Sequence, residues 1–470
     1  MSMSDLTMTI DGNEVPSLGT FFVEDPATGV SVATAPECTT EQLDAAMNAA
    51  NAAFDGWRRD PAARQRALLQ LADAVESHLS ELAALITTEE GKPLSESKGE
   101  IEGAIGELRW FGEFEDIDNL LRDDAQMFVK VVRRPIGPVA AITPWNFPLG
   151  TSMAKIAPAL AAGCTMVLKS SPYTPLSCLR FGELSREVLP RGVLNIVSGS
   201  DEVGARMTAH SIPRLISFTG SVATGKRVAT AAASDLKRLV LELGGNDPAI
   251  LLNDVDISKV ADALFANAFG NAGQVCVAIK RIYVPDELHD ELVEALVERA
   301  SALKVGDGHE EGTEMGPMVN KVQRDHVSEL VQDALSRGAH AVVGGHEMER
   351  PGYFFEPTIL TEIDDSFRIV SEEQFGPALP ILRYRDLEDA FRRANDSHFG
   401  LGASIWTSNP DRAAEIAASL DSGTVWINTH QDMVSGQPCA GFRWSGIGVE
   451  GGPYGFNNFT EPQAIHEVRA

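Results

Sequence analysis

The sequence predicts an α/β protein with two doubly wound units, each organised around a parallel sheet. Between residues 137 and 245, short apolar runs alternate with amphipathic helical stretches. A second series of the same kind follows Asn246. Buried strands separated by helices are typical of parallel sheets that are covered on both faces. At 470 residues, the chain is long enough for roughly three domains.

Composition and charge limit the classes of partner. With 44% hydrophobic and 23% charged residues, the chain has the composition of a globular protein that can bury sizeable cores. Its formal net charge of −28 argues against nucleic acid or an anionic membrane as a partner, because both would be repelled. Neither class is therefore expected as a partner.

Cysteine usage and the N-terminal residues predict a cytoplasmic location. The five cysteines contain no C-x-x-C pair, which indicates reduced thiols rather than a disulfide framework or a zinc site, so no metal is expected. The first residues lack the basic region and the apolar core of a signal peptide. No apolar run approaches the ~18 residues that are needed to span a bilayer.

The N-terminal quarter of the chain is predicted to be mainly helical. Apolar residues repeat at helical spacing over residues 40–118, with a second such run at 62–88. Residues 121–134 are instead strand-like and polar, and Pro135 and Pro138 end that stretch.

The two α/β units follow. In the first, the expected strands are 139–142, 165–168, 193–197, 215–218 and 239–241, and the expected helices are 153–162 and 177–188. In the second, the expected strands are 249–252, 281–284, 341–343, 381–384 and 423–427. The chain has no obvious repeat, low-complexity segment or flexible linker, so we expect the domains to pack closely.

A cysteine and a glutamate form a pair suited to thioester chemistry. Cys276 lies in the glycine-punctuated stretch 270–276, and Glu242 ends an apolar strand just before Gly244 and Gly245. The thiol can attack a carbonyl, and the carboxylate can activate the water that releases the acyl group. Taken singly, most free cysteines are small buried hydrophobes, and a strand-end glutamate is often a surface acid. Their shared context favours the catalytic interpretation.

Gly220 and Gly225 mark a turn that leaves one strand and opens a helix. Such glycines let a phosphate approach the backbone, and the helix N-terminus supplies unpaired N–H donors with a favourable dipole. A plain strand-to-helix turn explains an isolated pattern of this kind equally well. The literal G-x-G-x-x-G fingerprint at 446–451 lacks a preceding strand and a following helix, so we expect a loop without a cofactor there.

Together with other segments, these motifs resemble those of the NAD(P)-dependent aldehyde dehydrogenase superfamily, of the hydrolytic type that does not acylate CoA. The resemblance runs from about residue 20 to the C-terminus. The matching segments, in the family's order, are Pro144-Trp145-Asn146-Phe147-Pro148, Phe218-Thr219-Gly220-Ser221, Glu242-Leu243-Gly244-Gly245, Gly273-Gln274-Val275-Cys276 and Glu372-Glu373-Gln374-Phe375-Gly376-Pro377.

The resemblance implies an interrupted Rossmann-type cofactor domain, a catalytic α/β domain and a small β oligomerisation arm. The implied ranges are 1–118 and 136–243 for the cofactor domain, 244–444 for the catalytic domain, and 119–135 with 455–470 for the arm. In the family this arm pairs across a dimer, so a homodimer or a homotetramer is expected.

The resemblance also implies three catalytic roles. Cys276 would attack the aldehyde to form a thiohemiacetal and then a thioester, and Glu242 would activate the hydrolytic water. Asn146 would donate its amide to the developing oxyanion, and such a donor contributes on the order of 3 kcal/mol to the transition state. Without the other motifs, Asn146 would be a turn residue that bonds to its own backbone.

The implied cofactor is NAD, with NADP possible. The implied binding residues are Thr143, Trp145, Lys169, Gly220, Ser221, Gly225, Glu373 and Phe375. In the family, the lysine at position 169 reaches the adenosine ribose, and a glutamate three residues later often binds the ribose hydroxyls. Here Pro172 replaces that glutamate. The change removes an acceptor and also a charge that would repel a 2′-phosphate.

The implied substrate tunnel is wide and mainly apolar. Its expected lining residues are Phe147, Thr151, Ala154, Val275, Val277, Met433 and Cys439. Family members often carry bulky aromatic residues where Ala154 and Cys439 stand here. No arginine pair marks a carboxylate or phosphate on the substrate. An uncharged and fairly bulky aldehyde is therefore expected.

Three other functions remain as alternatives. A CoA-acylating aldehyde dehydrogenase would pass the acyl group to a thiol instead of water, but such relatives generally lack an acid at the position of Glu242. A catalytically silent structural or binding relative would not need Cys276, Glu242 and Asn146 together. An esterase that uses the same thiol would need neither the glycine turn nor Glu373.

Overall fold

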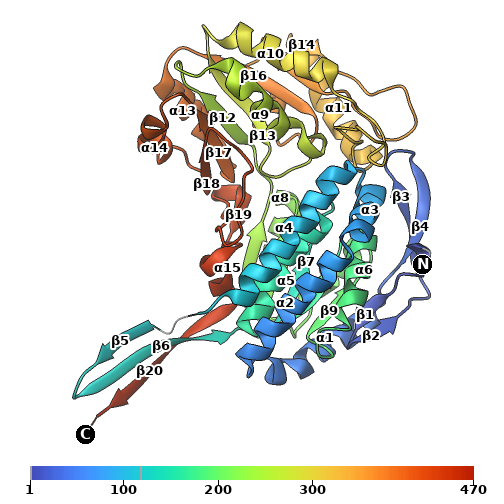
Figure 1. Cartoon of the computed structure of the whole chain (residues 1–470), viewed down its shortest axis with the longest axis vertical. Coiled ribbons are helices and arrows are strands. Elements are labelled where there is room, and N and C mark those ends of the chain that lie inside the picture. The colour runs from blue at the N-terminus through green and yellow to red at the C-terminus, as the bar shows by residue number, and fades with distance from the viewer. Residues whose placement is uncertain (1–2, 117–118, 470) are drawn as a thin grey trace.

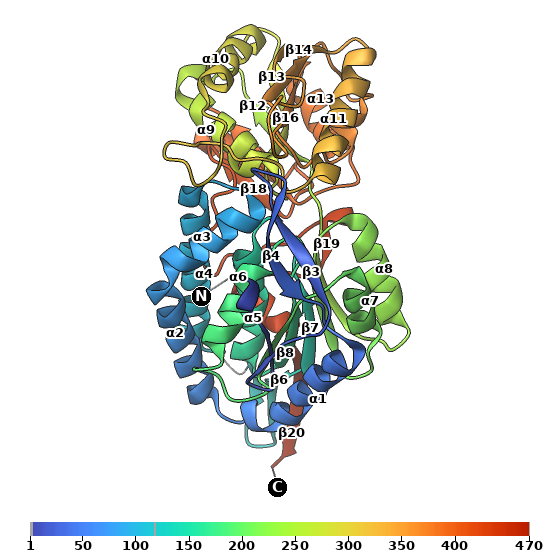
Figure 2. The same ribbon diagram turned by 90° about the vertical axis from the view of Figure 1, so that its right-hand side faces the viewer.

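The computed structural model describes residues 3–116 and 119–469. It has two sheets, each flanked by helices, and a narrow three-stranded sheet that projects from the body (Figure 1). A hairpin of β3 (Thr20–Asp25) and β4 (Val30–Pro36) runs beside the first sheet toward the second (Figure 2). Tyr353 ties this hairpin to the second unit, because its hydroxyl donates to Glu24 at 2.7 Å. The predicted α/β class is confirmed.

The first sheet has the strand order β19-β11-β10-β7-β8-β9-β1-β2. Its strands are β19 (Gly446–Ile447), β11 (Arg238–Glu242), β10 (Leu215–Thr219), β7 (Pro138–Ile142), β8 (Thr165–Lys169), β9 (Leu194–Val197), β1 (Met8–Ile10) and β2 (Asn13–Val15). The strands from β11 to β9 pair in parallel, as predicted. The antiparallel edge strands β1, β2 and β19 are not predicted, because each has three residues or fewer and too little pattern to read.

Alternate residues of the central strands supply two separate cores. Val139 and Ala141 of β7 pack with helices on one face, whereas Ala140 packs on the opposite face. This two-residue period is the one expected of a strand that is buried on both sides. The helices are α1 (Thr40–Trp57), α2 (Pro61–Ser77), α3 (Leu79–Glu90), α4 (Leu94–Glu113), α5 (Pro148–Ala162), α6 (Leu176–Ser185), α7 (Asp201–Ala209) and α8 (Val222–Ala233). Helix α6 ends at Ser185, three residues earlier than predicted.

The second sheet has the strand order β14-β15-β16-β13-β12-β17-β18 and is parallel except at β14. Its strands are β14 (His340–Val343), β15 (Thr358–Thr361), β16 (Ala378–Tyr384), β13 (Ile279–Pro285), β12 (Asp247–Leu251), β17 (Gly402–Trp406) and β18 (Thr424–Ile427). The helices around it are α9 (Ile257–Phe269), α10 (His289–Ala302), α11 (Lys321–Ser336), α12 (Arg368–Ser371), α13 (Leu387–Asn395) and α14 (Pro410–Ala417). Strands β15 and β17 are not predicted, because β15 is short and β17 is rich in small residues.

The third sheet, called the arm below, consists of β5 (Asn119–Asp123), β6 (Met127–Pro135) and β20 (Thr460–Val468). It extends away from both larger sheets (Figure 1). Four apolar side chains of the arm are exposed: Leu120, Leu121, Ile465 and Val468. The short helix α15 (Gly452–Asn458) precedes β20, so residues 455–458 belong to a helix rather than to a strand.

The chain passes from the first sheet to the second through a short connection. Glu242 ends β11, and Asp247 begins β12 only a few residues later. This connection places the end of one sheet beside the start of the other. In the described ranges, no helix is both long and apolar enough to cross a membrane.

Candidate active site

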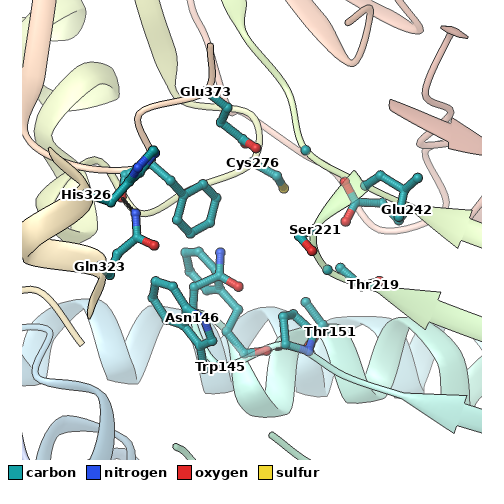
Figure 3. A pocket seen from close by; sticks show the side chains of 16 residues that line it. Trp145, Asn146, Thr151, Thr219, Ser221, Glu242, Cys276, Gln323, His326 and Glu373 are labelled. Atoms are coloured by element: carbon teal, nitrogen blue, oxygen red, sulfur yellow. Dashed lines mark hydrogen bonds between the residues drawn. The ribbon is translucent and has the colours of Figure 1, made fainter. Parts of the chain in front are cut away.

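A cavity of about 280 Å³ lies where the two sheets approach each other. Its lining residues are Pro144, Trp145, Asn146, Phe147, Thr151, Thr219, Gly220, Ser221, Glu242, Leu243, Gly244, Cys276, Gln323, His326, Glu373 and Phe375. Cys276 and Glu373 enter from the second unit, Asn146 and Trp145 from the opposite side, and Glu242 from the end of β11 (Figure 3). The three residues predicted to be catalytic therefore share one cavity.

A strained turn positions Cys276. The 3₁₀ segment Gly270–Gly273 contains consecutive left-handed residues, with φ of 48° at Asn271 and 52° at Ala272. Such backbone conformations persist only where the surroundings hold them. Here the buried Lys280 donates to the carbonyl of Gly273 at 2.7 Å. A Cβ at Gly273 would lie 2.4 Å from the carbonyl oxygen of Gly376, so this position requires glycine.

The thiol of Cys276 is in an environment that disfavours its ionised form. Burial is the main cause, and the negative charges of Glu242, Glu373 and Asp247 add to it, so the pKa of Cys276 is raised well above its ordinary value. Cys439 contributes in the same direction. The thiol therefore needs a nearby base before it can act as a nucleophile.

Glu242 can supply that base. It is 8% exposed, and its Oε1 has no hydrogen-bond partner among the described residues. Burial, followed by repulsion from Glu450, raises the pKa of Glu242 to about 8, while Lys155 and a hydrogen bond from Cys276 oppose the shift. A carboxylate with a pKa near neutrality can both accept and release a proton under ordinary conditions.

A buried ion pair lies behind Glu242. Lys155 of α5 is fully buried, and its Nζ donates to Thr219 Oγ1 at 2.7 Å and to the carboxylate of Glu450. Glu450 reaches this position because Gly446 and Ile447 form β19 on the edge of β11. The expectation of a plain loop at 446–451 is thus wrong: the segment begins with a short strand and is followed by helix α15.

Removing the cation of this pair should destabilise the protein. Among the residues that the structure describes, Lys155→Met leaves Glu450 with no salt-bridge partner at a side chain that is only 12% exposed. We expect a loss of about 3–5 kcal/mol in the free energy of unfolding. Thr219→Val is the matched control, because it removes one neutral hydrogen bond of Lys155 and should cost about 1 kcal/mol. Equal losses in the two variants, measured by denaturant unfolding, would contradict the importance of the ion pair.

Asn146 is held rigidly beside the nucleophile. Its Nδ2 donates to the carbonyl of Gln274, two residues before Cys276, at 2.8 Å. Its own carbonyl accepts hydrogen bonds from Lys92 at 2.6 Å and from Asn271 at 3.2 Å. The alternative of a turn asparagine bonding to its own backbone is therefore wrong, because the side chain reaches a distant part of the chain.

Five predicted cofactor residues line the cavity, namely Trp145, Gly220, Ser221, Glu373 and Phe375. Ser221 caps α8, since its hydroxyl accepts from the backbone N–H of Thr224 at 3.3 Å. Glu373 Oε1 accepts from the N–H of Gly245 at 3.0 Å. The first turn of α8 and the carboxylate of Glu373 thus offer donors for a phosphate and an acceptor for a ribose hydroxyl. These features fit a dinucleotide.

Three other predicted cofactor residues do not line the cavity. Thr143 and Lys169 are buried, and Lys169 Nζ donates to the carbonyl of Ser170 at 3.0 Å. Burial lowers the pKa of Lys169 to about 8. Gly225 packs against Leu243, because a Cβ there would lie 2.5 Å from that side chain.

Of the predicted substrate residues, Phe147 and Thr151 line the cavity. The other predicted substrate residues, Ala154, Val275, Val277, Met433 and Cys439, are not among its lining residues. Val275 is 5% exposed, because its side chain packs into the interior. Met433 is 41% exposed and lies on a surface loop.

Sequence reasoning missed several lining residues. Gln323 and His326 come from α11, and Gln323 donates to the carbonyls of Gln374 and Phe375 at 3.2 and 3.1 Å. Their spacing on the helix places them on one face. Polar residues on a helix face usually contact solvent, so the sequence contains no signal that would identify these two.

The chain matches the aldehyde dehydrogenase family model over residues 15–465. Succinate-semialdehyde dehydrogenase [NADP(+)] GabD of Escherichia coli (strain K12) is 39% identical over 93% of this chain and 92% of its own length. Retinaldehyde dehydrogenase 3 of Homo sapiens is 40% identical, over 95% and 89% respectively.

Solved structures agree with these similarities. The NAD⁺ complex of aldehyde dehydrogenase from Bacillus cereus superposes with a TM-score of 0.96 at 36% identity, covering 98% of this chain and 96% of that one. A match this complete includes both larger sheets and the arm. The chain belongs to the aldehyde dehydrogenase family.

Proposed function

We propose that the protein oxidises an aldehyde to a carboxylic acid through Cys276, Glu242 and Asn146, with NAD or NADP as the hydride acceptor. The observation that carries the proposal is the shared cavity, which brings a thiol, a carboxylate and an amide together from three separate parts of the chain. Each of these groups has a chemical role that the other two cannot fill.

The first half of the reaction forms a covalent intermediate. Glu242 takes the proton from Cys276, and the sulfur attacks the aldehyde carbon. The carbonyl π electrons move to the oxygen, where the amide of Asn146 and the backbone N–H of Cys276 donate hydrogen bonds. NAD or NADP, held by the first turn of α8 and by Glu373, would supply the hydride acceptor. As the oxyanion re-forms the carbonyl, the carbon loses its hydride and a thioester on Cys276 remains.

Water completes the reaction. Glu242 first releases to solvent the proton that it took from Cys276. It then removes a proton from water, and the resulting hydroxide attacks the thioester carbonyl. The C–S bond breaks, the carboxylic acid leaves, and the sulfur of Cys276 recovers a proton. Oε1 of Glu242 has no hydrogen-bond partner among the described residues, so it is the oxygen that would accept this proton from water. Because Glu242 is retained, we favour hydrolysis over transfer of the acyl group to CoA.

We propose NAD as the cofactor, with NADP also accepted. Pro172 cannot bind ribose hydroxyls as a glutamate would, so the usual barrier to a 2′-phosphate is missing. The Escherichia coli relative is named for NADP, and the Bacillus cereus structure contains NAD⁺. Use of both cofactors by this chain is therefore part of the proposal.

Initial rates with an aldehyde panel test this function. We expect reduction of both cofactors, with higher kcat/KM for bulky uncharged aldehydes than for a semialdehyde that carries a carboxylate, because the residues around the nucleophile are acidic. The panel should pair each neutral aldehyde with a carboxylate-bearing analogue of similar length. Absence of turnover in folded protein that binds cofactor would contradict the proposed function.

We further propose the domain division 1–118 with 136–243, 244–444, and 119–135 with 455–470. The exposed apolar residues of the arm support assembly into a dimer or tetramer through this sheet. The absence of a C-x-x-C pair among the cysteines supports a cytoplasmic location.

A further inference from the structure

A buried lysine behind the cavity contacts the segment that carries Asn146. Lys92 lies in the short link between α3 and α4, and its side chain is 0% exposed. Its Nζ donates to Glu100 Oε2 at 2.9 Å and to the carbonyl oxygen of Asn146 at 2.6 Å. Nζ also lies 3.7 Å from the centre of the Phe147 ring, within the range of a cation–π contact. One ammonium group thus contacts two consecutive residues that line the cavity.

The carboxylate that pairs with Lys92 holds the next part of the same segment. Glu100 of α4 has a side chain that is 1% exposed. Its Oε1 accepts from the backbone N–H groups of Leu149 and Gly150 at 2.9 and 3.0 Å. Both N–H groups belong to the first turn of α5, where such donors have no partner within the helix. The two oxygens of one carboxylate therefore join Lys92 to the start of α5.

The same helix also contacts the turn that precedes Cys276. Glu96 of α4 accepts from the backbone N–H of Asn271 at 3.0 Å. Asn271 is one of the left-handed residues of that turn, and its Nδ2 donates to the carbonyl of Asn146 at 3.2 Å. The carbonyl oxygen of Asn146 is thus the point at which Lys92 and the turn of the nucleophile meet.

Lys92 is itself held in place. Its backbone N–H donates to Glu90 Oε2 at 3.0 Å. Its carbonyl oxygen lies against Gly308 of the second unit, where a Cβ would lie only 2.4 Å away. A group that positions another must have a fixed location of its own, and these contacts supply it.

These contacts decide the direction of the Asn146 amide. The amide has two N–H bonds, and one of them donates to the carbonyl of Gln274 at 2.8 Å. Since Lys92 fixes the main chain and Gln274 fixes one hydrogen, the second hydrogen has a set direction. A donor lowers the barrier when it is already aimed at the place where negative charge develops. Loss of the Lys92 contact should weaken this donor without removing it.

We propose that Lys92 is a positioning residue for the oxyanion donor, which fixes the main chain of Asn146 and so aims its amide at the aldehyde oxygen. Lys92 does not line the cavity, so it acts through Asn146 and not on the substrate. The inference rests on the proposed function, in which Asn146 stabilises the oxyanion. It predicts that Lys92 and Asn146 affect the same step and that their effects are not independent.

The test compares Lys92→Met, Asn146→Ala and the double variant in single turnovers of the full-length protein. Protein in excess is loaded with NAD and mixed with the uncharged aldehyde that the native protein oxidises fastest. Formation of NADH reports the first half of the reaction alone, because hydrolysis follows hydride transfer. Lys98→Met is the matched control, since it makes the same change at an exposed position of α4. This control should keep the native rate.

Asn146→Ala should slow the formation of NADH by about 10²–10³-fold. Lys92→Met should slow it by about 10–10²-fold, because the donor is misplaced but still present. The double variant should be no slower than Asn146→Ala, since no donor is left for Lys92 to position. Binding of NAD, measured by fluorescence titration, should stay native in every variant.

Two results would overturn the proposal and leave the proposed function intact. One is a native rate in Lys92→Met beside a slow Asn146→Ala. The other is a double variant whose loss is the product of the two single losses, which indicates that Lys92 acts on a different part of the site. A native rate in Asn146→Ala would instead contradict the oxyanion role on which the inference rests, so the two failures are distinguishable.

A charge-balanced variant separates positioning from simple neutralisation of Glu100. Lys92→Met alone leaves that carboxylate buried without its cation, which destabilises the fold. Lys92→Met with Glu100→Gln removes both charges and keeps an acceptor for the first turn of α5, so it carries the test if Lys92→Met does not fold. It should be as slow as expected for Lys92→Met, because the carbonyl of Asn146 still lacks its ammonium donor. A native rate in this variant would show that Lys92 only balances a charge and would overturn the proposal.

Discussion

Cys276→Ala should abolish aldehyde oxidation, with a loss of roughly 10⁴-fold or more in kcat/KM. The variant removes the atom to which the substrate carbon becomes bonded, so neither the thiohemiacetal nor the thioester can form. Cofactor binding should survive, because the donors at the start of α8 and the carboxylate of Glu373 remain. Initial-rate assays of cofactor reduction measure turnover. A fluorescence titration with cofactor measures binding.

The control for this variant is Cys38→Ala. Cys38 is likewise a free thiol, but it is buried in the core beside α1 and does not line the cavity. We expect this variant to keep its activity. Retained turnover in Cys276→Ala, with the same substrate preference as the native protein, would eliminate Cys276 as the nucleophile.

Glu242→Gln should stop the reaction after one turnover. Glutamine keeps the shape of the side chain but cannot remove a proton from water, so loss of the base should slow hydrolysis by about 10²–10⁴-fold. Rapid mixing should show a burst of reduced cofactor close to one equivalent per active site, followed by a very slow phase. The burst itself should be slower than in the native protein, because Glu242 also takes the proton of Cys276 in the first half of the reaction.

The pH dependence of the native enzyme follows from the same residue. The base acts in its ionised form, and the pKa of Glu242 is raised to about 8 by burial and by Glu450. Where hydrolysis limits the rate, activity should rise with pH up to about 8 and then level off. Glu107→Gln is the matched control, since burial also raises the pKa of this carboxyl, to about 7, but Glu107 does not line the cavity. This variant should show neither a burst nor a changed profile.

The residues of the site that could be predicted are those that lie in a short, distinctive segment of the sequence. Cys276, Glu242 and Asn146 each lie in a distinctive segment at the end of a strand or in a tight turn. Parallel strands bring such ends together, so local patterns were enough to place these residues in one cavity. The same logic predicted the parallel strands from β9 to β11.

The parts that could not be predicted depend on contacts between distant segments. Lys155 meets Glu450 only because β19 adds to the edge of β11, and a two-residue strand leaves no periodic signal. The close contact between Gly225 and Leu243 likewise joins two segments that the sequence pattern does not connect.

The most direct test of the account is the mass of the Cys276 peptide from Glu242→Gln after a single turnover. The protein is mixed with an oxidised cofactor and one equivalent of aldehyde, quenched in acid and digested. The account predicts a peptide heavier by the acyl group of the substrate, in an amount that matches the reduced cofactor formed. Reduced cofactor in full yield with an unmodified Cys276 peptide would contradict a thioester at this residue.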